Sequence, residues 1–122
     1  MELKVGEYVR TEFGNIGKFY RPASENADVY YIYIAKDGTK ISSRYDSIIK
    51  HSFDIKDLVQ AGDIILYNVN SKMTDIEIVK EHIDARTQEK TLRVGFWSLE
   101  QVKIKEILTK EQFTQMKYIV GE

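Results

Sequence analysis

Alternating apolar and polar residues predict β-strands over most of the first half of the chain. Residues 3–11 and 16–21 form two strand-like runs separated by a glycine-containing turn, which is typical of a hairpin. Residues 29–34 are β-branched or aromatic at every position, and an Asp-Gly pair then predicts a tight turn into a strand at 40–43. The first half is therefore predicted to contain two hairpins.

The second half continues the strand pattern and adds two short helices. Strands are predicted at residues 63–67, 74–83, 91–96, 102–108 and 117–120. A short helix at 52–59 is indicated by a Ser or Asp cap and by apolar residues spaced to cover a core. A capping box over residues 109–112 opens the other helix, in which Phe113 and Met116 are expected to face inward.

A short sequence of the form Gly-acid-apolar-apolar occurs twice, at 6–9 and at 62–65. In small SH3-like barrels this pattern opens the first strand after a loop, although turn chemistry alone would also account for it. We expect a mainly β fold with short helices, either SH3-like or a more elaborate small antiparallel barrel. One compact domain over 1–122 is the default, and two barrel-like halves at 1–50 and 60–122 are the alternative.

Composition narrows the class of protein. The 122 residues are 43% hydrophobic, which is enough for one core, and the chain has no cysteine for disulfides or thiolate metal sites. No apolar run has the length of a signal peptide or a membrane span, so we expect a soluble cytoplasmic protein. Eighteen basic residues against nineteen acidic ones disfavour nucleic acid as a partner, unless folding assembles a basic patch.

Catalytic and metal-binding motifs are not evident. His51 precedes a helix cap, and His82 falls on the apolar side of its predicted strand, so both are interpreted as structural. Glu81, His82 and Asp84 lack the further histidine that a zinc site without cysteine usually has. The glycine-rich phosphate motifs and the nucleophile elbow are missing. We therefore expect neither enzymatic activity nor a cofactor or metal.

Tyrosine is the most informative residue type, with eight in the chain and six of them in the first half. Alternation places Tyr31 and Tyr33 on one face of a strand and Tyr30 on the other, so one set must leave the core unless both faces are covered. Exposed tyrosine beside arginine would form a binding surface, whereas in the alternative interpretation the rings line the barrel core. The candidate binding residues are Tyr20, Arg21, Tyr31, Tyr33, Arg44, Tyr45, Arg93 and Trp97.

Three blocks of sequence resemble small uncharacterised proteins of phages and prophages of Gram-positive bacteria. The blocks are residues 4–11 with Gly14 and 16–18, residues 51–63, and residues 109–118, and they cover about half of the chain in the same order. The resemblance implies a genomic setting, and with it the cytoplasm of a host cell, but no assigned activity and no functional residues. Residues 22–45 and 68–100 match nothing that we can name, and we expect partner specificity to reside there.

These observations lead to one main hypothesis about function and two alternatives. The main hypothesis is a non-catalytic protein that binds a host or phage protein and modulates it, with inhibition of a host defence system as one form. The alternatives are sequestration of a small nucleotide by tyrosine and arginine, and an SH3-like nucleic-acid module. So strand-rich a chain is also expected to self-associate.

Overall fold

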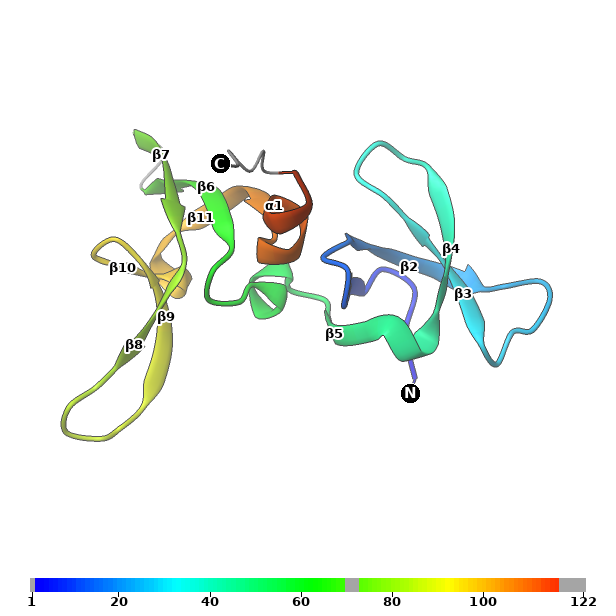
Figure 1. Cartoon of the computed structure of the whole chain (residues 1–122), viewed down its shortest axis with the longest axis horizontal. Coiled ribbons are helices and arrows are strands. Elements are labelled where there is room, and N and C mark those ends of the chain that lie inside the picture. Colours follow the sequence, from blue (N-terminus) through cyan, green and yellow to red (C-terminus); the bar gives the residue numbers. More distant parts are fainter. Residues whose placement is uncertain (1, 70–72, 117–122) are drawn as a thin grey trace, which may run out of the picture. The chain divides into compact units, whose positions relative to one another are not determined.

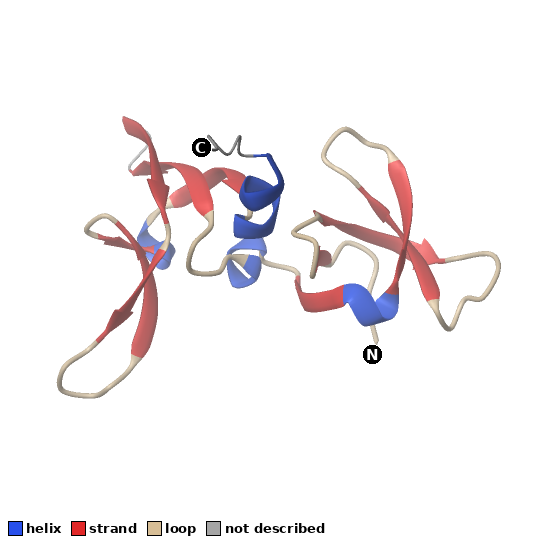
Figure 2. Ribbon diagram, in the orientation of Figure 1, coloured by secondary structure: helices blue, strands red, loops and turns tan. Residues whose placement is uncertain are grey.

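The computed structural model describes residues 2–69 and 73–116 of the chain. These residues fall into two compact units, the first ending at Leu58 and the second beginning at Val59 (Figure 1). Each unit has a hydrophobic core of its own. The described strands make three small antiparallel sheets, so the expected mainly β, small-barrel fold is confirmed (Figure 2). The boundary between the units falls at Leu58 and Val59, and the expectation of a single compact domain stays a prediction.

The first unit is a five-stranded antiparallel sheet with the order β4-β3-β2-β1-β5. Its elements are β1 (Tyr8–Thr11), β2 (Ile16–Pro22), β3 (Tyr30–Ile34), β4 (Lys40–Arg44), the 3-10 helix η1 (Tyr45–Ser47), β5 (Ile48–Ser52) and the 3-10 helix η2 (Ile55–Leu58). The last strand, β5, follows the 3-10 turn η1 and pairs with the first strand, β1. Both predicted hairpins are present, and the predicted helix at 52–59 is reduced to η2.

The second unit repeats this order with one strand divided. Its elements are β6 (Ile64–Val69), β7 (Met73–Ile78), β8 (Lys80–Ile83), β9 (Lys90–Val94), β10 (Trp97–Ser98), the 3-10 helix η3 (Leu99–Gln101), β11 (Lys103–Leu108) and the α-helix α1 (Lys110–Met116). Strands β11-β6-β7 form one sheet and β10-β9-β8 another. Val79 lies between β7 and β8 and is buried, so the strand predicted over 74–83 bends into the core at this residue.

The repeated Gly-acid sequence forms a defined backbone motif in the first unit. Gly6 has a φ of +94°, a conformation that favours glycine, and the N–H of Glu7 donates to the carbonyl of Lys4 at 3.0 Å. The Glu7 carboxylate accepts a hydrogen bond from the Lys4 N–H at 2.8 Å and so closes the turn. Two backbone hydrogen bonds join this turn to Phe19 on β2. The Gly6 N–H donates to the Phe19 carbonyl, and the Phe19 N–H donates to the Glu7 carbonyl.

The second unit contains the same bonds in the same places. Gly62 has a φ of +97°, the Asp63 N–H donates to the Gln60 carbonyl at 3.1 Å, and the Asp63 carboxylate accepts from the Gln60 N–H at 2.8 Å. Val79 takes the place of Phe19: its N–H donates to the Asp63 carbonyl, and its carbonyl accepts from the Gly62 N–H. The two short sequences therefore mark two copies of one arrangement, in which the turn is also bonded to the next strand or to Val79.

Each core is built from buried residues of its own unit, on strands and in the segments between them. In the first unit the core cluster consists of Val9, Phe19, Tyr31 and Tyr33. In the second unit it consists of Val59, Ile65, Tyr67, Val79, Val94, Leu99 and Val102. Burial of these apolar side chains, at about 1.5–3 kcal/mol each, is the main stabilising term in both units.

Three apolar residues that the sequence pattern placed inside are exposed. Alternation over 91–96 groups Phe96 with Leu92 and Val94, but Phe96 is 95% exposed, because the chain turns at Gly95, whose φ is +58°. Phe113 and Met116 on α1 are also exposed. This helix is held at its start instead, where the Lys110 N–H donates to Asp63 and Thr109 accepts the predicted capping bond. The strand predicted at 117–120 lies outside the described residues.

Candidate functional site

The outward face of β3 carries an apolar row in the middle of the first sheet. Tyr31 and Tyr33 point into the core, so Tyr30, Ile32 and Ile34 point to the opposite side, where all three are half-buried. Both long edges of β3 are paired, to β2 and to β4. The row therefore has neighbouring side chains on either side.

Basic residues flank this apolar row on both neighbouring strands. On β2, Lys18 pairs with Ile34 and Arg21 with Ile32. On β4, Lys40 pairs with Ile34 and Arg44 with Tyr30, and all four cations are exposed. Strands β2, β3 and β4 contain no aspartate or glutamate. We call this surface the basic face: Lys18, Tyr20, Arg21, Tyr30, Ile32, Ile34, Lys40 and Arg44.

Tyrosine rings lie beneath the cations of the basic face. A register shift between Phe19 and Arg21 places Tyr20 on this side of β2. The centroid of its ring lies 4.6 Å from the Lys40 Nζ and 5.9 Å from the Arg21 Cζ. Because β3 separates β2 from β4, the contact between Tyr20 and Lys40 crosses the apolar row. Such cation–π contacts contribute about 0.5–1 kcal/mol each at exposed sites and hold the cations in place.

Two of the cations are also held by hydrogen bonds. Arg44 lies over the Tyr30 ring and donates from Nε and Nη2 to the carboxylate of Asp46, at 3.1 and 3.0 Å. These bonds lower the pKa of Asp46 and raise that of Arg44, so both are charged and partly neutralise each other. Arg21 donates to the carbonyl of Pro22 and the hydroxyl of Ser24, neither of which carries charge. Arg21, with Lys18 and Lys40, thus supplies most of the net positive charge.

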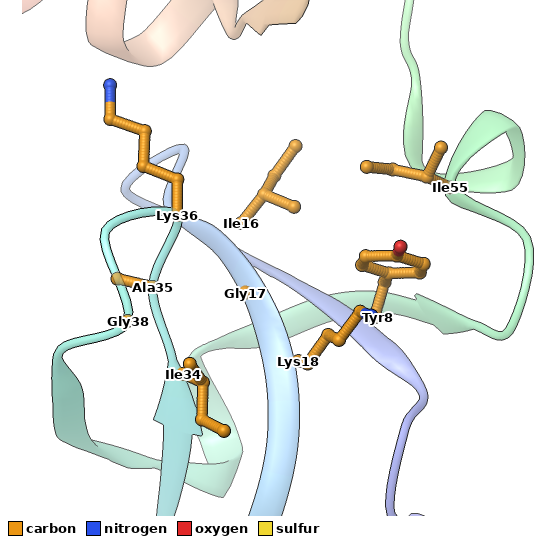
Figure 3. Close-up of a pocket in the computed structure, with 9 residues that line it drawn as sticks. All are labelled: Tyr8, Ile16, Gly17, Lys18, Ile34, Ala35, Lys36, Gly38 and Ile55. Carbon is orange, nitrogen blue, oxygen red and sulfur yellow. The ribbon is translucent and has the colours of Figure 1, made fainter. Parts of the chain in front are cut away.

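A groove of about 380 Å³ adjoins the basic face and shares Lys18 and Ile34 with it. Its remaining lining comes from β1, the start of β2, the β3–β4 turn and η2. Figure 3 shows the Tyr8 ring beside Ile55 on one side of Gly17, with the turn that carries Lys36 on the other. The Lys18 Nζ lies 5.3 Å from the Tyr8 ring centroid. The groove is therefore apolar inside, with two ammonium groups beside it.

Tyr31 and Tyr33 do not belong to a binding surface, because both are in the core of the first unit. Tyr31 is fully buried, with its ring centroid 6.1 Å from Phe19, 5.9 Å from Tyr33 and 5.1 Å from Tyr45. Burial raises the pKa of Tyr31 to about 12 and also raises those of Tyr33 and Tyr45. Tyr45, on η1, is half-buried against this cluster, so three of the eight candidate residues serve packing.

The other candidates fall into two places. Tyr20, Arg21 and Arg44 come together on the basic face, as described above. Arg93 is half-buried on β9 and Trp97 is partly exposed on β10, both in the second unit and outside the first sheet.

Sequence reasoning missed Tyr8, Lys18, Lys36 and Lys40. Single lysines carry no motif, and the near-neutral total charge concealed their grouping. The grouping of Lys18 and Lys40 could have been inferred from the lack of carboxylates in all three of the segments 16–22, 30–34 and 40–44.

The two histidines lie in different units, His51 on β5 and His82 on β8. The Nδ1 of His51 lies 2.8 Å from the Oε1 of Glu7, and this hydrogen bond, with that from Lys4, lowers the pKa of Glu7. His82 is exposed on β8 instead of lying against the apolar side. Within residues 2–69 and 73–116, no cluster of three or more potential ligands is arranged to hold a metal ion. No helix in the same ranges is long and apolar enough to cross a membrane.

No protein-family model matches the chain, and no curated protein matches it either. The chemistry of the basic face and of its groove is therefore what bears on function.

Proposed function

We propose that this chain is a non-catalytic binding protein whose basic face engages an acidic surface of a partner protein. The observation that carries the proposal is the arrangement on β2–β4: an apolar row along β3, cations on both sides, and no carboxylate on any of the three strands. The resemblance to phage and prophage proteins supports a host or phage protein as the partner. Modulation of that protein, including inhibition of a host defence system, is the proposed outcome of binding.

The basic face has the composition of a protein–protein interface. Such interfaces have an apolar centre and a polar rim, and tyrosine and arginine supply much of their binding energy. Here the half-buried Ile32 and Ile34 occupy the centre, while Arg21, Lys40 and Arg44 surround them. An acidic partner would satisfy the cations and cover the apolar row in one contact.

The positive charge of this face arises from the separation of charges within a neutral unit. Residues 1–58 contain nine lysines and arginines and nine aspartates and glutamates. Four of the nine cations lie on β2–β4, and all of the carboxylates lie elsewhere. Neighbouring like charges repel, which opposes folding, so this segregation supports a binding role for the face.

The proposal is tested by capture of partners with matched charge variants. Tagged protein would be expressed in a Gram-positive bacterium, and the variant R21E/K40E would be compared with the control K50E/K105E. Lys50 on β5 and Lys105 on β11 are exposed and lie outside the basic face, so the control makes the same change in net charge. Circular dichroism would check that both variants are folded.

We expect a stoichiometric protein to be captured by the wild type and the control, and lost from R21E/K40E. Its recovery should also fall as salt is raised, because exposed charges are screened. A captured protein that binds R21E/K40E as well as the wild type would contradict the role of the basic face.

A nucleic-acid interface is the second candidate, favoured by one observation: folding assembles the basic patch that composition did not reveal. Tyr20 and Tyr30 accompany the cations, and tyrosine with basic residues is a pattern of single-strand binding. Cations already cover these rings, however, which leaves less ring surface for stacking on bases. Fluorescence anisotropy with single-stranded DNA and RNA oligonucleotides would test it, and strong salt-dependent binding would place this candidate first.

A further inference from the structure

The groove beside the basic face has a mainly apolar lining. Ile16, Ile34 and Ile55 line it together with the ring of Tyr8, and Gly17 adds only backbone (Figure 3). Its volume, about 380 Å³, lies near the lower end of the range of about 300–1,000 Å³ that is usual for ligand sites. The size and lining suit one large apolar or aromatic group.

The charged residues that line the groove have a single sign, and Asp37, which neighbours Lys36 in the turn, is not part of the lining. Lys18 on β2 and Lys36 in the β3–β4 turn are both exposed, and none of the lining residues is acidic. Lys18 also belongs to the basic face, so the groove continues that surface. An occupant should therefore combine an apolar group with negative charges next to it.

The second unit shows that the fold does not require lysine at these two places. Ile78 is the counterpart of Lys18: it precedes Val79 as Lys18 precedes Phe19, and it pairs with Ile64 as Lys18 pairs with Tyr8. Phe96 lies in the turn between the third and fourth strands, as Lys36 does. Both counterparts are apolar and exposed, so folding alone does not account for the pair of cations.

We propose that the groove binds a short acidic segment of the partner protein, with one aromatic or large aliphatic side chain seated among the isoleucines. Carboxylates on either side of this anchor would pair with Lys18 and Lys36. This inference rests on the proposed function, and it names the feature of the partner that is recognised. A nucleotide fits less well, because the lining holds no side-chain amide and no hydroxyl except that of Tyr8 to bind a base edge.

The experiment uses a peptide with the sequence Glu-Glu-Trp-Glu-Glu as the probe and the full-length protein labelled with ¹⁵N. We expect the amide signals of Gly17, Ile34 and Gly38 to shift on titration, since these residues line the groove. The same peptide with glycine in place of tryptophan, and one with lysine in place of glutamate, should bind much more weakly. The variant K18E/K36E should lower the affinity about tenfold, while K50E/K105E should lower it far less.

Several results would overturn the inference. Equal binding of the glycine peptide would show that the groove holds no anchor, and equal loss in both charge variants would show that only net charge matters. Groove signals that shift with adenosine monophosphate but not with the peptide would assign the site to a nucleotide. If K18E/K36E captures the partner as well as the wild type while R21E/K40E does not, the groove inference fails and the proposed function stands.

Discussion

Replacing Tyr31 by alanine should remove most of the stability of the first unit. The side chain is fully buried, and its ring contacts three other aromatic rings at centroid distances of 5.1–6.1 Å. Truncating such a side chain to alanine costs about 3–5 kcal/mol. At about 0.05–0.15 kcal/mol per residue, a unit of 58 residues has a free energy of unfolding of only about 3–9 kcal/mol.

The conservative variant Tyr31→Phe separates packing from polar contacts. The hydroxyl is buried beside Ser43 and Ser47 but has no hydrogen-bond partner of good geometry among the described residues. Removing it should therefore change the free energy of unfolding by less than about 1 kcal/mol.

Urea unfolding followed by circular dichroism would measure both Tyr31 variants. The fluorescence of Trp97, the only tryptophan, would report on the second unit in the same samples. An alanine variant with the midpoint of the wild type would refute the placement of Tyr31 in the core.

Three further predictions follow from buried groups and close contacts. Asp63→Ala should lower the free energy of unfolding of the second unit by about 3–5 kcal/mol, because the buried carboxylate accepts hydrogen bonds from the backbone N–H groups of Gln60 and Lys110. Urea unfolding followed by tryptophan fluorescence would measure this, and an unchanged midpoint would contradict it. Gly17→Ala should destabilise the first unit far more than Gly38→Ala. At position 17 the added Cβ would clash with the Tyr33 ring and lie 2.7 Å from the Ile34 carbonyl oxygen, whereas at position 38 it would enter open space and only the φ of +86° opposes it. Similar thermal midpoints for the two variants would exclude this close packing. Burial raises the pKa values of Tyr31 and Tyr67 to about 12, and the hydrogen bond to Glu77 adds to the effect at Tyr67. Because both tyrosines ionise near pH 10 in the unfolded chain, the free energy of unfolding should fall as the pH rises from about 10 towards 12. A constant melting temperature over that range would contradict the assignment.

Local sequence was sufficient for the hairpins and for the start of each unit. The φ-positive glycines and the acid that follows them act within a few residues, so their chemistry can be read without knowledge of the rest of the fold. The exposure of Phe96 could not be read in this way. The alternation of apolar and polar residues continues through Gly95 in the sequence, whereas in the structure the backbone turns at Gly95 and then forms β10.

The tyrosines show the limit of strand periodicity. Alternation indicated that Tyr31 and Tyr33 share a face and that Tyr30 lies on the other, and the structure has this arrangement. Periodicity does not say which face is covered, because both faces of this strand are apolar or aromatic. The packing of Phe19 and Tyr45 against Tyr31 decides that the Tyr31 side is the core.

By itself, the sequence determined a mainly β chain of the small-barrel kind and two copies of a turn that opens a first strand. Those features depend on interactions between residues close in the chain, or on a period of two along a strand. Only the tertiary structure decided the basic face and its groove. Their residues are spread from Tyr8 to Ile55 in a unit with no net charge, and strand pairing brings four cations together on one surface and leaves the carboxylates elsewhere.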